Sequence, residues 1–154
     1  MGDKTIIQPG TQAPDFSIKD QDDSEVRLSD LKGKKVLLSF HPLAWTGVCA
    51  KQMRSLEDNY ETFRERGAVA LGLSVDPVPS KRAWAKELGI ADTRLLADFW
   101  PHGEVAKAYD NFIDKLGFSG RANVLIDETG KVIWSKIYEL SELPDIQEVI
   151  DQLG

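Results

Sequence analysis

Hydrophobic and polar residues follow one another along the chain in a pattern that predicts several strands. Period-two alternation over residues 15–19 and 25–28, joined by the polar turn 20–23, predicts an N-terminal β-hairpin. Nearly continuous apolar runs over 35–40 and 68–75 are typical of strands that are covered on both faces. We therefore expect these two strands to be buried.

Apolar residues at helical spacing predict the helices. The first helix is expected over 47–66, with Gly67 as its C-terminal stop. A second helix, capped by Ser80, is expected over 80–89, and a short helix is expected over 104–109. Pro144 should begin the last helix. The apolar face of the first helix consists of Cys49, Met53, Leu56, Tyr60 and Phe63.

Three further strands are expected in the second half of the chain, over 94–97, 121–126 and 132–138. The last two flank Asp-Glu-Thr-Gly at 127–130, a hairpin signal. Hairpins give antiparallel strand pairs, whereas helical crossovers give parallel ones. The order of elements thus predicts an α/β fold with a mixed central sheet flanked by helices, and the length fits a single domain over 1–154.

Composition and charge exclude several classes of partner. The net charge is −6, with 25 acidic and 19 basic side chains. No basic run exceeds two residues, so nucleic acid is not an expected partner. No apolar stretch approaches the roughly 20 residues that span a bilayer. The first six residues contain no apolar core of a signal peptide. A myristoylation motif requires serine or threonine at position 6, where this chain has Ile6, so no membrane attachment is expected.

The chain contains one cysteine, Cys49, in 154 residues. A lone thiol cannot form an internal disulfide and suits a reducing compartment, which favours a cytoplasmic protein. Cys49 falls in or beside the first turn of the first helix, where unpaired N–H groups and the macrodipole favour an anion. The thiolate is the nucleophilic form of cysteine.

The residues before Cys49 distinguish a reactive thiol from an inert, packed one. A cysteine on an apolar helix face is commonly inert. Here, however, Pro42 can exclude water, the Thr46 hydroxyl can donate to a thiolate, and Gly47 lets the backbone approach closely. Together, at the junction of a strand and a helix, these three residues favour a reactive cysteine.

At this junction the sequence resembles the peroxiredoxins of the AhpC/TSA superfamily, thiol peroxidases with a thioredoxin-like fold. Residues 42–49 match the Pro-x-x-x-Thr-x-x-Cys signature, and residues 9–16 are similar to the N-terminal segment of the family. Arg121, after Gly117 and Gly120, stands where the family has its active-site arginine. Residues 42–47 and 99–103 look most like the one-cysteine, alkyl hydroperoxide reductase E type, so the resemblance covers nearly the whole chain.

The resemblance implies a role for each matching residue. Cys49 would attack the terminal oxygen of hydrogen peroxide or an organic hydroperoxide and become a sulfenic acid. Thr46 would hydrogen-bond the sulfur and the attacked oxygen, and Pro42 would shield the pocket. Arg121 would stabilise the thiolate and the charge that moves onto the leaving oxygen. The fold implied is thioredoxin-like with an N-terminal β-hairpin extension.

Two positions depart from the family pattern. Gln52 replaces the glutamate that many relatives carry three residues after the cysteine. We expect this neutral side chain to leave the arginine charge less compensated, which favours the thiolate of Cys49. His41 stands where relatives usually have an aromatic residue, and it is either a proton donor near the pocket or a histidine packed at an interface. His41, His102 and Cys49 are too few and too irregularly spaced for a metal site, and no cofactor is expected.

The absence of a second cysteine determines the expected catalytic cycle. The sulfenic acid must be reduced by an external thiol, either of low molecular weight or on a thioredoxin- or glutaredoxin-like protein. Trp45 and Trp100 lie in loops where the family has a subunit contact, so a homodimer or a higher homo-oligomer is expected. Two other functions remain open, a slow redox sensor or relay and a catalytically silent interaction domain.

Overall fold

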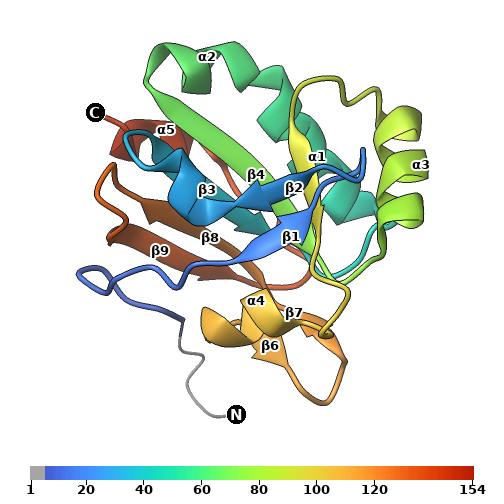
Figure 1. Ribbon diagram of the computed structural model, residues 1–154. Coiled ribbons are helices and arrows are strands. Elements are labelled where there is room, and N and C mark those ends of the chain that lie inside the picture. The colour runs from blue at the N-terminus through green and yellow to red at the C-terminus, as the bar shows by residue number, and fades with distance from the viewer. Residues whose placement is uncertain (1–5) are drawn as a thin grey trace.

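The computed structural model describes residues 6–154, and the expectations about signals within residues 1–5 lie outside this range (Figure 1). A seven-stranded sheet in the order β2-β1-β5-β4-β3-β8-β9 forms the centre, and β6 and β7 make a separate hairpin. The strands are β1 (Ser17–Lys19), β2 (Glu25–Arg27), β3 (Lys35–Phe40), β4 (Ala68–Ser74), β5 (Arg94–Ala97), β6 (Phe112–Ile113), β7 (Phe118–Ser119), β8 (Arg121–Ile126) and β9 (Val132–Tyr138).

The helices connect and cover these strands. They are the 3₁₀ helix η1 (Leu28–Leu31) and the α-helices α1 (Gly47–Asp58), α2 (Tyr60–Glu65), α3 (Val78–Leu88), α4 (Glu104–Ala108) and α5 (Ile146–Gln152). Among residues 6–154, no helix has both the length and the apolar composition needed to cross a bilayer.

The mixed sheet follows from how its strands are joined. β3, β4 and β5 are parallel because α1, α2 and α3 provide the crossovers between them. β8 and β9 are antiparallel because only a short turn separates them, and β8 also pairs antiparallel with β3. The expected N-terminal hairpin is present as β1 and β2. The prediction of an α/β fold with a mixed sheet and an N-terminal hairpin is confirmed.

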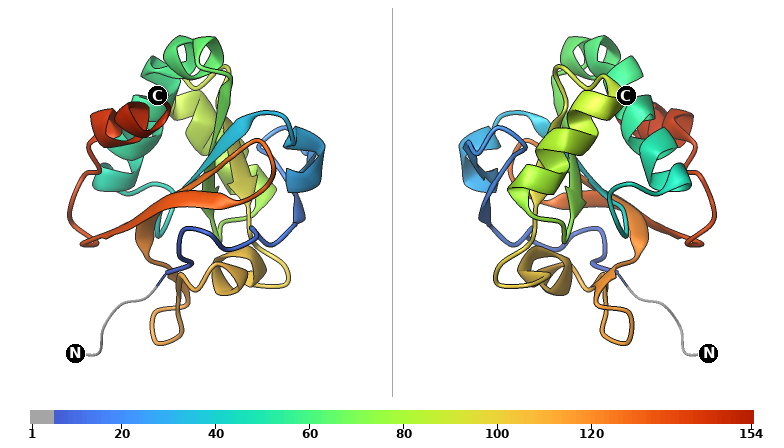
Figure 2. Two further views of the ribbon diagram at one scale, coloured as in Figure 1. Left: turned by 90° about the vertical axis from the view of Figure 1, so that its left-hand side faces the viewer. Right: turned by 90° about the vertical axis from the view of Figure 1, so that its right-hand side faces the viewer.

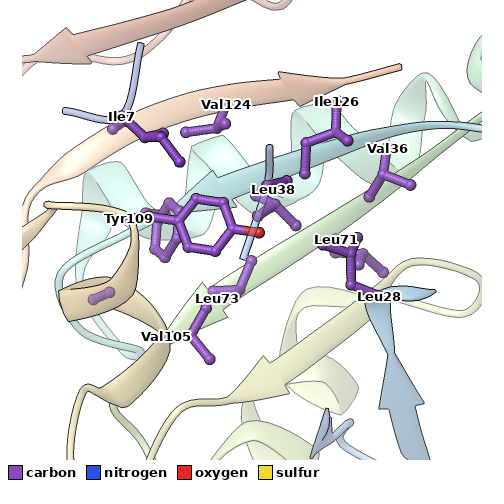
Figure 3. Close-up of a cluster of buried hydrophobic side chains, with 14 of the residues drawn as sticks. Ile7, Leu28, Val36, Leu38, Leu71, Leu73, Val105, Tyr109, Val124 and Ile126 are labelled. Atoms are coloured by element: carbon purple, nitrogen blue, oxygen red, sulfur yellow. The ribbon is translucent and has the colours of Figure 1, made fainter. Parts of the chain in front are cut away.

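Each face of the sheet has its own hydrophobic core. One core packs α1, α2, α3 and α5 against side chains such as Leu37 and Leu125. The other lies under α4, η1 and the N-terminal segment, and α4 occupies a different part of the molecule from α1, α2, α3 and α5 (Figure 2). Tyr109 is at its centre, close to Leu38 and Leu73 (Figure 3), and the Tyr109 hydroxyl donates to the Pro14 carbonyl at 2.6 Å. Strands with both faces covered explain the continuous apolar runs in the sequence.

Three predicted helix boundaries are wrong. The helix expected over 47–66 is interrupted at Asn59, which has φ −106° and ψ 14°, and it forms α1 and α2 instead. Ser80 does not cap α3, since the helix begins two residues earlier, where Pro79 in the first turn needs no hydrogen-bond acceptor. α5 begins after Pro144, because the Asp145 carboxylate accepts the N–H of Gln147 at 3.0 Å.

Candidate active site

The candidate site lies where β3 ends and α1 begins (Figure 1). The loop over 41–46 connects the two elements, and Cys49 is in the first turn of α1. In the antiparallel pairing of β3 with β8, Phe40 lies opposite Ala122. Arg121, the first residue of β8, is therefore beside the start of this loop, although it is 72 positions from Cys49 in the sequence.

Cys49 and Arg121 are in direct contact. The Arg121 Nη1 group donates to the Cys49 Sγ atom at 3.3 Å. Both side chains are buried, with exposed fractions of 0% for Cys49 and 3% for Arg121. A guanidinium is always charged, and burial weakens the screening of that charge by water. The arginine therefore stabilises negative charge on the sulfur.

Two acceptors fix the position of the Arg121 guanidinium through three hydrogen bonds. The Leu140 carbonyl accepts from Nε at 3.1 Å and from Nη2 at 2.7 Å. The Gln52 Oε1 atom accepts from Nη1 at 2.6 Å. Gln52 is in turn held by donating to the Ser39 hydroxyl at 2.7 Å and to the Phe40 carbonyl at 3.1 Å. All these acceptors are neutral, so no carboxylate among residues 6–154 directly compensates the arginine.

A cavity of about 280 Å³ reaches this cysteine. Pro42 and Thr46 both contribute to its wall. The Thr46 hydroxyl, which the sequence predicts to donate to the sulfur, donates instead to the Leu43 carbonyl at 2.9 Å. Because a hydroxyl has a single proton, Thr46 cannot donate to Cys49 in this state. The remaining lining residues are Leu43, Gly47, Val48, Cys49, Phe118, Arg121 and Leu140.

His41 is not at a surface, so the expected interface packing is wrong. Its side chain is completely buried, and its Nε2 atom is 2.9 Å from the Lys81 Nζ atom. Burial, together with the positive charges of Lys81 and Arg121, holds the pKa of His41 well below its ordinary value. His41 is thus neutral at physiological pH and a poor proton donor.

The two loops with expected subunit contacts carry exposed aromatic side chains. Trp45 is 53% exposed, Phe99 47% and Trp100 79%, whereas Trp84 is buried in the core. The nearby His102 interacts with the Gly117 carbonyl through Nε2 at 2.7 Å. No group of three or more His, Cys, Asp or Glu side chains within residues 6–154 could hold a metal ion.

Two contributors to the site are not predicted by the sequence. The Leu140 carbonyl holds Arg121, but any residue has a carbonyl, so position 140 carries no signal. Lys81 reaches the site through His41. A buried lysine flanked by arginine and serine on a helix resembles an ordinary surface residue in the sequence.

The chain is similar to several known proteins. The model of the AhpC/TSA family matches residues 9–135. The alkyl hydroperoxide reductase E of Mycobacterium tuberculosis is 36% identical over 150 residues, which cover 97% of each chain. The chloroplastic peroxiredoxin Q of Triticum aestivum is 36% identical over 127 residues, 82% of this chain and 57% of the relative.

A solved structure gives the same result for the fold. The reduced 2-Cys peroxiredoxin of Plasmodium vivax superposes with a TM-score of 0.87 at 32% identity, covering 94% of this chain and 79% of that one. The fold is therefore the thioredoxin-like fold of peroxiredoxins, as the sequence resemblance implies. With a matching family model and a full-length relative, and with one cysteine in its sequence, the chain belongs to the AhpC/TSA family and is a one-cysteine peroxiredoxin, a thiol peroxidase.

Proposed function

We propose that Cys49 is the peroxidatic residue and that the protein reduces hydrogen peroxide and organic hydroperoxides. The observation that carries this assignment is the 3.3 Å hydrogen bond from Arg121 to the sulfur of the only cysteine. A thiolate stabilised by a fixed cation in the first turn of a helix is a strong nucleophile. The adjoining cavity is large enough for a peroxide group.

The proposed reaction uses each site residue in turn. The Cys49 thiolate attacks the terminal peroxide oxygen, the O–O bond breaks, and the sulfur becomes a sulfenic acid. The departing oxygen leaves as an alkoxide or hydroxide, which takes a proton to give an alcohol or water. Arg121 stabilises this developing charge, and Pro42 restricts access of water. Thr46 rotates its hydroxyl from the Leu43 carbonyl toward the attacked oxygen, since a hydroxyl reorients readily.

Regeneration requires thiols from outside the chain. One external thiol attacks the sulfenic acid, giving water and a mixed disulfide with Cys49. A second thiol then displaces Cys49 as a thiolate and is itself oxidised to a disulfide. We propose a low-molecular-weight thiol or a thioredoxin- or glutaredoxin-like protein as the donor. The lone thiol supports a cytoplasmic location, because such thiols persist in reducing compartments.

We further propose that the protein is one domain that forms a homodimer. Both hydrophobic cores share the single central sheet, which supports a single domain. The exposed side chains of Trp45, Phe99 and Trp100 support a contact through their loops. Sedimentation velocity should give a dimer at micromolar concentration and a monomer for Trp45→Ala combined with Trp100→Ala. A monomeric wild type would contradict this proposal.

Stopped-flow fluorescence tests the enzymatic function directly. The four tryptophans should report a fast change on mixing the reduced protein with stoichiometric peroxide, followed by mass spectrometric detection of one added oxygen on Cys49. Cys49→Ser should show neither signal. A wild-type rate no greater than that of free cysteine, or a Cys49 that resists both peroxide and alkylation, would contradict the proposal.

A further inference from the structure

Lys81 is a completely buried lysine behind the pocket loop, the loop over 41–46 that joins β3 to α1. Its exposed fraction is 0%, and its Nζ atom donates to the Ser74 hydroxyl at 2.6 Å. Nζ also lies 2.9 Å from the Nε2 atom of His41, the residue that immediately precedes Pro42. Lysine is almost never fully buried without a partner, because removing an ammonium group from water is costly. In the part of the chain that the structure describes, no carboxylate contacts Nζ directly, so this burial requires an explanation.

A second path connects the same ammonium group to the middle of the pocket loop. The Ser74 hydroxyl, which accepts from Lys81, donates to the Asp76 Oδ2 atom at 2.6 Å. This carboxylate oxygen also accepts the backbone N–H of Ala44 at 2.8 Å. Lys81 therefore holds the loop that carries Pro42 and Thr46 at two points, directly at its start and through Ser74 and Asp76 at its centre.

The loop needs such support because it contains a strained residue. Trp45 has φ 71°, in the left-handed region that non-glycine residues rarely adopt. Its indole Nε1 group donates to the hydroxyl of Ser80, the residue next to Lys81, at 3.1 Å. The start of α3 thus contacts the loop at a third position. Such backbone strain persists only where the surrounding structure holds it.

The hydrogen bonds specify the protonation of this cluster. An ammonium group has only donors, so the His41 Nε2 atom must accept from it, and the histidine proton is on Nδ1. Nδ1 is buried without a partner among the described residues. In neutral His41 the Nδ1–H group therefore lacks an acceptor among the described residues, while Nε2 accepts a hydrogen bond from the charged Lys81.

We propose that Lys81, in its charged form, is a positioning residue that fixes the loop over 41–46 beside Cys49 and thereby sets the rate of peroxide reduction. This inference rests on the proposed peroxidase function of Cys49. Lys81 does not contact the reacting atoms and acts through His41, Ser74 and Asp76. Its loss should slow a reaction that needs the loop, but not one that needs only a thiolate.

The charges around Lys81 give this proposal a pH dependence. Burial lowers the pKa of Lys81 to about 7, against the opposing effects of Asp76 and Cys49. The other nearby titratable groups are His41, which is neutral, and Arg121, which is always charged; the positive charges of Lys81 and Arg121 both lower the pKa of His41. Lys81 is therefore charged below about pH 7 and loses its charge as the pH rises above it.

The test compares two reactions of the same sulfur. The rate of Cys49 oxidation by hydrogen peroxide depends on the loop, whereas its alkylation by iodoacetamide depends on the thiolate and on access. Both rates are measured for the wild type, Lys81→Met and the matched control Lys86→Met, an exposed lysine on the same helix. Ser74→Ala is a smaller change that cuts only the path to Asp76.

We expect the ratio of oxidation to alkylation rates to fall in Lys81→Met by about ten- to a hundredfold, the loss that a displacement of about 1 Å can cause. Ser74→Ala should lower the ratio by less, and Lys86→Met should leave it unchanged. In the wild type the ratio should fall as the pH rises through about 7, and in Lys81→Met it should be flat.

Three results would overturn the inference. The first is a ratio that stays at the wild-type value in Lys81→Met. The second, should that variant not fold, is an unchanged ratio in Ser74→Ala. The third is a wild-type ratio that does not vary with pH, which would show that the charge is not needed. A slow wild-type oxidation would instead contradict the peroxidase function itself, and the inference with it.

Discussion

Gln52→Glu tests how the charge of Arg121 acts on the thiolate. The wild-type amide accepts from Arg121 through Oε1 and donates to Ser39 and Phe40 through Nε2. A glutamate of the same shape keeps the first contact, now as an ion pair, and loses both donations. The change therefore places a negative charge next to the cation that stabilises Cys49.

The distances in the site set the size of the effect. The Arg121 Nη1 atom is 3.3 Å from the Cys49 sulfur and 2.6 Å from the Gln52 Oε1 atom. The sulfur and Oε1 are therefore no more than 5.9 Å apart, which is the sum of these two distances. Two unit charges at this separation repel by about 3 kcal/mol at an effective dielectric constant of about 20. This corresponds to about a hundredfold change in the thiol–thiolate equilibrium constant, and pairing with Arg121 reduces the effect, so we expect a change of about tenfold or more in that constant.

The rate of iodoacetamide alkylation, measured across the pH range in which the thiol titrates, reports the thiolate fraction. Its pH profile should move to higher pH in Gln52→Glu. Gln52→Met is the matched control, because it also loses the two donations to Ser39 and Phe40 and, in addition, the contact with Arg121, without adding charge, while Leu140 still holds Arg121 through two bonds. An unmoved profile in Gln52→Glu, or an equal movement in Gln52→Met, would refute the electrostatic argument.

Three further predictions concern the pocket, the core and the acid stability. Thr46→Val should slow peroxide oxidation by about a hundredfold or more but spare alkylation, because the hydroxyl is needed only as a donor to the attacked oxygen; equal losses in stopped-flow and alkylation assays would exclude this role. Gly72→Ala should destabilise the protein by about 1–3 kcal/mol in urea unfolding, since the added Cβ would overlap the Met53 sulfur, and an unchanged urea midpoint would show that this side chain moves aside freely. Burial opposes ionisation of Glu57, but hydrogen bonds from three successive backbone N–H groups after α3 prevail and hold its pKa below the ordinary value. The ionised form therefore stabilises the fold at neutral pH, and this contribution is lost as the pH falls below about 4.5. Urea midpoints of Glu57→Gln should depend less on pH in this acidic range, and a dependence as steep as that of the wild type would contradict the assignment.

Much of the fold can be predicted from local patterns. The strands over 35–40, 94–97, 121–126 and 132–138 have the predicted bounds, because each is an apolar run closed by polar, proline or glycine residues. The interruption at Asn59 was missed, since the apolar spacing continues across it. The hairpin of β6 and β7 was also missed, because strands of two residues are too short to show a period.

By itself the sequence determined the local part of the candidate site. Pro42, Thr46 and Cys49 are close in the chain, and the change from strand to helix periodicity places them at one junction. The family resemblance identified Arg121, but only the sheet order brings it to the sulfur across 72 positions.

The tertiary structure alone decided what holds these residues in place. The carbonyl of Leu140 and the buried ammonium of Lys81 act from segments that are distant in the sequence. Hydrophobic periodicity specifies which face of an element is buried, but not which distant element will cover it. Hydrogen bonds between such elements depend on that second choice, so they could be read only from the folded chain.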